Sequence, residues 1–229
     1  GNGRNGVLVT DTNTNGNGVR GNLIGLAADG TTALGNAGHG VFVTNAAEFN
    51  FIGGTTAGAG NAIAHNGGAG VLVGNDPAQG MTTDAGGAIE VLGNSIFANG
   101  GLGIDLGAFG GVTPNDAGDA DAGPNGLQNF PALTAAFLEG TDLLVGGTIN
   151  TTANTTVRIE FFASPAADAG GYGEGRTYLG FVDVAVGAGG TVGFSAAFET
   201  SLVHAGDVIT ATATVGGSTS EFSLALAVI

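Results

Sequence analysis

Short apolar stretches bounded by glycine and asparagine recur along the first half of the chain. Four of them place mostly aliphatic residues directly after a glycine: GVLV at 6–9, GVFV at 40–43, GVLV at 70–73 and GIDL at 103–106. The steps between their glycines are 34, 30 and 33 residues. No segment shows the spacing of a helix. Self-similarity at this period indicates a solenoid, and short strands within each repeat indicate the coils of a parallel β-helix.

The repeat also predicts which side chains face inward. A single coil cannot bury its own aliphatic side chains, whereas stacked coils bury those of their neighbours. The pattern therefore predicts one interior column and a further interior set from the other faces of the coil: Val7, Val41, Val71 and Ile104, then Ile24, Ile52, Ile63 and Ile96.

Asparagine marks the bends between these strands. Asparagine tolerates left-handed backbone, and its amide can bond to like amides in neighbouring coils. We expect ladders of stacked polar side chains at two sets of corner positions: Asn22, Asn61 and Asn94 at strand starts, and Asp11, Asn45 and Asn75 after strands. The alternative is that most of these asparagines bind sugar.

The third coil carries an extra segment, NDPAQGMTTDAGG at 75–87. Its proline and glycines predict an exposed loop that adds nothing to the core period. Asp76 and Asp84 are the charged groups that it offers to a ligand. His39 and His65 occupy different positions of the repeat, so we expect each to be a surface or turn residue.

The pattern changes near residue 107. The stretch GAFGGVTPNDAGDADAGPNGLQNFP is rich in proline and aspartate, and longer strands with alternating polarity follow it. Their number and spacing predict an immunoglobulin-like sandwich. We expect seven strands: 132–138, 142–149, 155–163, 176–186, 190–198, 207–215 and 219–228.

Several segments together resemble a recurring arrangement in large bacterial secreted proteins. They are GNLIGLAADGTTALGNAGHGVFV, GNSIFANGGLGIDLG, VTPNDAGDADAGPNGLQNFP and GEGRTYLG. Those proteins carry right-handed parallel β-helix repeats followed by a β-sandwich module. The resemblance implies an extracellular or cell-surface location and no particular reaction. That family often has a cysteine at two positions where this chain has Ala167 and Ala225.

These observations predict an all-β chain in three parts. Residues 1–110 form a short right-handed parallel β-helix of about three coils. Residues 111–131 form an acidic linker rich in proline and glycine, and residues 132–229 form an immunoglobulin-like β-sandwich.

Charge narrows the choice of partners. The 229 residues hold 19 acidic groups against four arginines, with no lysine and no cysteine, for a net charge of −15. This charge repels phosphate backbones and favours divalent cations, so nucleic-acid binding is not expected. The longest apolar runs fall far short of the ~20 residues that a membrane-spanning helix needs, so membrane insertion is not expected either.

The acidic linker is the strongest chemical signal. Carboxylates this close together repel one another unless water or a cation intervenes, and oxygen ligands on a glycine-rich loop suit Ca²⁺. We expect six ligands: Asp105, Asn115, Asp116, Asp119, Asp121 and Asn125. The alternative is a solvated acidic linker. GGLGID at 100–105 matches a calcium-binding nonapeptide only in part, and it is not repeated in tandem.

Catalysis has little support in the sequence. A glycosidase needs two carboxylates about 5–9.5 Å apart, and the acids of the solenoid fall in different columns. Glu174, Arg176 and the nearby tyrosines either bind the edge of a sugar or form a local salt bridge. We therefore expect a non-enzymatic extracellular structural module, a spacer or a self-assembling fibre subunit. Its partners would be copies of itself, head to tail, or neighbouring domains of a surface assembly. The alternative is a protein that binds or cleaves glycans.

Overall fold

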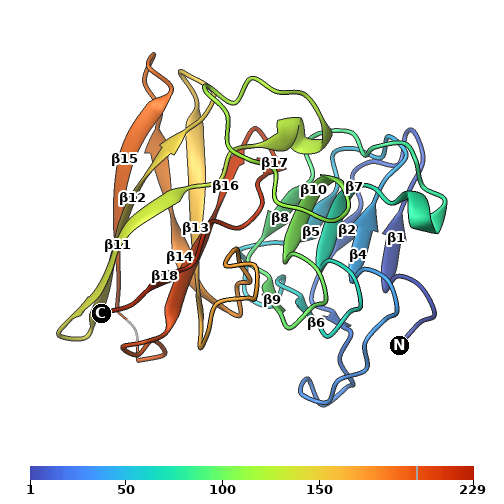
Figure 1. Cartoon of the computed structure of the whole chain (residues 1–229), viewed down its shortest axis with the longest axis horizontal. Coiled ribbons are helices and arrows are strands. Elements are labelled where there is room, and N and C mark those ends of the chain that lie inside the picture. Colours follow the sequence, from blue (N-terminus) through green and yellow to red (C-terminus); the bar gives the residue numbers. More distant parts are fainter. Residues whose placement is uncertain (200) are drawn as a thin grey trace.

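The chain forms two β-rich regions that lie side by side (Figure 1). The structure is a computed structural model that describes residues 1–199 and 201–229. Parallel coils make up the first region, and two antiparallel sheets make up the second. We call the first region the solenoid and the second the antiparallel region. The chain is thus all-β with a parallel β-solenoid of about three turns, as the repeat predicts.

Three short parallel sheets run along the solenoid, in the orders β1-β4-β7-β10, β2-β5-β8 and β3-β6-β9. Their strands are β1 (Val7–Val9), β2 (Gly18–Val19), β3 (Leu23–Ile24), β4 (Val41–Val43), β5 (Phe51–Gly53), β6 (Ala62–Ala64), β7 (Val71–Asn75), β8 (Glu90–Leu92), β9 (Ser95–Phe97) and β10 (Ile104–Ala108).

The register of the first sheet confirms the predicted column of aliphatic residues. Val41 pairs with Val7 on one side and Val71 on the other, and Ile104 pairs with Val71. The other two sheets add two more columns, with the registers Ile24–Ile63–Ile96 and Val19–Ile52–Val91. Nearly all of these side chains are buried in one cluster. Full burial of one such side chain contributes about 1.5–3 kcal/mol, so the stacked columns hold the coils together.

Asparagine side chains connect the coils at the corners, as predicted for one of the two sets. Asn22 donates from Nδ2 to Oδ1 of Asn61 at 3.0 Å, and Asn61 donates to Asn94 at 2.8 Å. The other predicted set forms no ladder. Asn45 donates to Thr10, and Asn75 donates to Asp84 within the third-coil insertion.

A second ladder, which the sequence analysis missed, runs through Asn36, Asn66 and Asn99. The Nδ2–Oδ1 distances are 2.7 Å from Asn36 to Asn66 and 2.9 Å from Asn66 to Asn99. The backbone N–H of Asn66 also donates to Oδ1 of Asn99, at 3.1 Å. Each of these residues opens a short NAG or NGG segment, so the signal was present in the sequence. These amides are buried and satisfy backbone groups that would otherwise have no partner.

The antiparallel region consists of the sheet β11-β12-β15 and the sheet β14-β13-β16-β17, with β18 also paired to β16. Its strands are β11 (Ala132–Glu139), β12 (Asp142–Asn150), β13 (Thr156–Ser164), β14 (Thr177–Ala185), β15 (Thr191–Glu199), β16 (Val208–Val215), β17 (Ser218–Thr219) and β18 (Leu226–Ala227). Both sheets contribute alternate residues to one buried cluster, which includes Leu143, Phe161 and Ile209.

The last predicted strand, 219–228, is broken in the structure. Only its two ends are strands, as β17 and β18, and the residues between them turn toward the solenoid. The ring of Phe222 packs in the solenoid cluster together with Phe162 of β13. The predicted strand is therefore interrupted because its middle residues cover the last coil.

The two ends of the solenoid differ. The last coil is covered by the antiparallel region and by the 3-10 turn η2 (Pro124–Leu127), in which Asn125 bonds to both backbone groups of Ile89. Because Leu127, Phe162 and Phe222 all join the solenoid cluster, the boundaries at 110 and 131 stay predictions. At the first coil, the described residues give the strands β1, β2 and β3 a partner on one side, so they are the edge strands of their sheets.

The buried ladder gives a direct test of what holds the coils together. We expect Asn66→Ala to lower the free energy of unfolding by about 2–4 kcal/mol, because the buried donors on Asn36 lose their acceptor. The control is Asn22→Ala, at the exposed end of the other ladder, which should cost less than about 1 kcal/mol. Urea unfolding of both variants measures the difference. Equal losses would show that the buried ladder has no special role.

Candidate functional site

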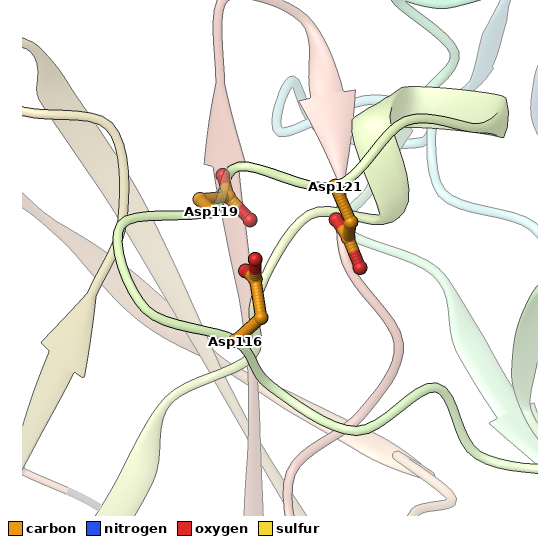
Figure 2. Close-up of side chains that lie close together, drawn as sticks. All are labelled: Asp116, Asp119 and Asp121. Carbon is orange, nitrogen blue, oxygen red and sulfur yellow. The ribbon is translucent and has the colours of Figure 1, made fainter.

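Three of the six predicted calcium ligands come together on one loop. Asp116, Asp119 and Asp121 each place a carboxylate oxygen within 4.8 Å of the others. Figure 2 shows the three side chains on the segment that leads into η2, with Asp116 and Asp119 pointing toward each other. We call this group the acidic cluster.

Hydrogen bonds hold two members of the acidic cluster in place. Asp119 accepts from the backbone N–H of Asn129 at 2.7 Å and from the hydroxyl of Thr151 at 3.1 Å. Asp116 accepts from the backbone N–H of Ala120. Burial, and then the neighbouring carboxylates, raise the pKa of Asp119 and of Asp121 above the usual range of an aspartate. A cation bound here would relieve that repulsion.

The side chains of the other three predicted ligands are bonded to other groups, and ion binding by all six residues stays a prediction. Asn115 bonds through its side chain to both backbone groups of Phe130, which fastens the loop. Asn125 is buried against Ile89. Asp105 is fully buried in the last coil, where Oδ2 accepts from the backbone N–H of Gly110. Each residue is used for structure, and sequence spacing alone did not distinguish these roles.

A second feature is a buried His–Asp pair on the outside of the first sheet. His39 is 1% exposed, so it is not a surface residue, although it does lie in the bent segment before β4, as one of the two predicted alternatives has it. Its Nε2 lies 3.2 Å from Oδ2 of Asp76, and its Nδ1 accepts from the backbone N–H of Ala69 at 3.0 Å. The proton of the neutral ring therefore sits on Nε2 and is donated to Asp76. Burial lowers the pKa of His39, although Asp76 opposes the shift. Neither ring nitrogen is free to accept a proton from a substrate.

The third-coil insertion is mostly exposed or half-exposed, as predicted, and its one buried carboxylate, Asp76, is the partner of His39. Met81 packs on the buried outward-facing side chains of Phe42 and Leu72. Asp76 precedes the 3-10 turn η1 (Pro77–Gln79), and its side chain caps that turn by accepting from the backbone N–H of Ala78. The insertion is therefore packed over the outer face of the sheet because that face is apolar.

The insertion also forms one wall of a cleft of about 610 Å³. The cleft lies over His39, between the insertion and the N-terminal segment. Its lining includes one guanidinium, one amide and one aromatic ring that a ligand could contact, from Arg4, Gln79 and Phe109. Arg4 donates to the carbonyl oxygen of Gln79, and the ring of Phe109, 39% exposed, packs edge-on against His39. We call this feature the cleft.

Glu174 and Arg176, which the sequence places together, have separate roles. Glu174 is buried and accepts from the side chain of Asn99 at 2.7 Å. The guanidinium of Arg176 lies over the ring of Phe97, 4.7 Å from its centroid. The local salt bridge considered in the sequence is not among the ion pairs of the described residues.

No protein-family model matches this chain, and no curated protein matches it significantly. Within the described residues, no helix has the length and apolar character needed to span a membrane.

Proposed function

We propose that this chain is a non-enzymatic structural module of an extracellular or cell-surface assembly, extended through the open edge of its first coil. The observation that carries the proposal is the contrast between the two ends of the solenoid. The last coil is covered, whereas β1, β2 and β3 have partners on one side only among the residues that the structure describes. Unpaired strand edges are templates for pairing with further strands.

The side chains on this edge support an interaction role. Leu8 on β1 is 43% exposed and Leu23 on β3 is 46% exposed. The backbone of Val7 bonds to the second coil through its N–H, so in a parallel ladder the N–H and C=O of Leu8 point the opposite way. A strand from a neighbouring coil, in another copy or another domain, would meet these groups.

The finer features of the fold belong to the same proposal. The arrangement β11-β12-β15 against β14-β13-β16-β17 supports an immunoglobulin-like sandwich. Right-handed winding of the coils and a secreted, bacterial-type location rest on the resemblance described above.

Proline substitution at the open edge tests the assembly. We expect the wild-type protein to associate with rising concentration at neutral pH, and Leu8→Pro to abolish this because proline removes the outward N–H. The matched control, Leu8→Ala, shortens the side chain but keeps the N–H, so it should still associate. Sedimentation velocity measures all three proteins. A wild-type protein that stays monomeric throughout, or equal effects of the two variants, would contradict edge pairing.

Calcium binding by the acidic cluster is a further part of the proposal. We expect millimolar Ca²⁺ to raise the melting temperature, because a ligand that binds only the folded state stabilises it. Asp121→Asn should remove most of that increase, whereas Asp84→Asn, on the insertion, should leave it intact. Calorimetry with and without chelator measures the shift. An unchanged melting temperature of the wild-type protein would rule out the site.

The cleft supports glycan binding as a second candidate function. It combines a concave surface, a half-exposed aromatic ring and a guanidinium, which together suit a sugar that bears a carboxylate. We expect a glycan array to show binding to acidic oligosaccharides, and Phe109→Ala and Arg4→Ala to weaken it at least tenfold. Arg20→Ala is the control, because Arg20 lies over Phe51, away from the cleft. No binding to the array, or equal loss in the control, would exclude this function.

A further inference from the structure

Three buried glutamates of the antiparallel region cover the last coil. Glu160 on β13, Glu174 between β13 and β14, and Glu221 between β17 and β18 are 0%, 6% and 2% exposed. We call these three residues the glutamate cap. All three carboxyl groups accept hydrogen bonds from backbone N–H groups of the last coil or of the segment directly after it.

Glu174 occupies the place that an asparagine of a further coil would take. In the second ladder, the N–H and Nδ2 of Asn66 both donate to Oδ1 of Asn99. The N–H and Nδ2 of Asn99 donate in the same way to Oε1 of Glu174, at 3.2 and 2.7 Å. The ladder thus continues from the solenoid into the antiparallel region without a break.

The other two glutamates cover neighbouring positions. Glu160 accepts at 2.9 Å from the N–H of Gly93, the residue before Asn94 at the top of the first ladder. Glu221 accepts from the N–H of Leu106 on β10 at 3.0 Å and from that of Thr113 at 2.9 Å. The glutamate cap therefore supplies acceptors where a fourth coil would otherwise supply them.

The first coil carries the side chains that such a fourth coil would need. Asn2 lies one step below Asn36 in the second ladder, and its N–H donates to Oδ1 of Asn36 at 2.9 Å. Asn22 begins the first ladder, below Asn61. A second copy stacked on the last coil would bring its Asn2 above Asn99 and its Asn22 above Asn94. The glutamate cap and the first coil of a second copy are thus alternative partners for the same donors.

The charges around the glutamate cap are mostly negative. Glu160 faces Arg158, Tyr178 and, from the solenoid, Glu90. The guanidinium of Arg158 is already paired with Asp183 at 2.9 Å. Glu174 faces Asp168, and Glu221 faces Asp105.

Burial is the main reason why the glutamate cap binds protons more tightly than exposed glutamates do. It raises the pKa of each of the three glutamates from 4.5 to about 7. A raised pKa means that the closed arrangement binds protons more tightly than an open one. Protonation of the three glutamates therefore stabilises the closed arrangement fully below about pH 4.5, and this stabilisation is lost as the pH rises through 7.

We propose that the glutamate cap is a proton-operated latch, which holds the antiparallel region on the last coil when protonated and frees that coil for the first coil of a second copy when ionised. The stacking half of this proposal rests on the proposed function. The latch itself does not. Opening would also uncover Phe162 and Phe222, which now pack in the solenoid cluster.

Hydrogen exchange tests the latch. Between pH 5 and pH 8, ionisation of each glutamate with these pKa values should increase the fraction of open molecules about 70-fold. In an open molecule the antiparallel region no longer covers the last coil. In protein dilute enough to stay monomeric, and after correction for intrinsic chemistry, we expect exchange at the amides of Gly93, Asn99 and Leu106 to rise at least tenfold. The internal reference is Val41, which is bonded between two coils and should change less than twofold.

A matched pair of variants separates the latch from general effects of pH. Glu160→Gln keeps an acceptor for Gly93 but cannot ionise, so the pH-dependent rise at that amide should fall markedly. Glu139→Gln, at the exposed end of β11, should leave the rise unchanged. Should Glu160→Gln not fold, Glu174→Gln with Asn99 as the reporter makes the same comparison. Equal exchange at pH 5 and pH 8, or a rise that Glu160→Gln and Glu174→Gln both leave intact, would overturn the latch.

Sedimentation at the same two pH values, in about 0.15 M salt to screen the net charge, tests the stacking. We expect species larger than a dimer at pH 8 and none at pH 5. Leu8→Pro should abolish these species, and at pH 8 exchange at Asn99 should then be at least as fast as in the wild-type protein, because no second copy covers the last coil. Exchange that rises without association would leave the latch standing and overturn stacking by a second copy. Association that survives in Leu8→Pro would refute the proposed function at its open edge.

Discussion

The structure depends on an acceptor for each backbone N–H that is buried between stacked coils or beneath the antiparallel region. Within the solenoid the next coil provides it, through its carbonyl groups and through the asparagine side chains at the corners. Burial of the aliphatic columns supplies most of the stabilisation, but the hydrophobic effect has no preferred direction and does not by itself fix the register of the coils. The buried amides do fix it, because an unsatisfied donor in the interior costs about 1–3 kcal/mol.

This requirement explains the asymmetry of the molecule. A stack of coils always has a last coil, whose donors need something other than a further coil. Here the antiparallel region provides carboxylates, a hydroxyl on Thr219 and a backbone carbonyl of Gly175. Carboxylates accept strongly but are costly to bury when ionised, so the same groups that end the stack also make it sensitive to protons. At the first coil, Asn17 and Asn22 bond to their own segment and to the coil above.

The repeat predicted the solenoid well because its signal is local. Val7, Val41 and Val71 each follow a glycine at nearly constant spacing, and the period alone places them in one column. The ladder of Asn22, Asn61 and Asn94 was predictable for the same reason. Asn36, Asn66 and Asn99 were not predicted, although each opens an NAG or NGG segment, because the predicted ladder followed the pattern of glycine before asparagine, whereas these three share glycines after the asparagine.

Features that depend on contacts between distant segments could not be predicted. Nothing local shows that His39 pairs with Asp76 or that Asn125 bonds to Ile89. The role of Glu174 needs a partner 75 residues away. The acidic cluster was half predicted, since Asp116, Asp119 and Asp121 share a short loop, whereas the remaining residues were assigned by proximity in sequence alone.

Hydrogen exchange of individual backbone amides across the solenoid, measured at a single acidic pH, tests most directly whether the antiparallel region completes the stack of coils. If the antiparallel region completes the stack, the amides of Asn99 and Leu106 on the last coil are as protected as that of Val71 in the middle, while the outward amide of Leu8 on the first coil exchanges freely. Exchange at Asn99 and Leu106 as fast as at Leu8 would contradict the account, because the two ends of the solenoid would then be equally open.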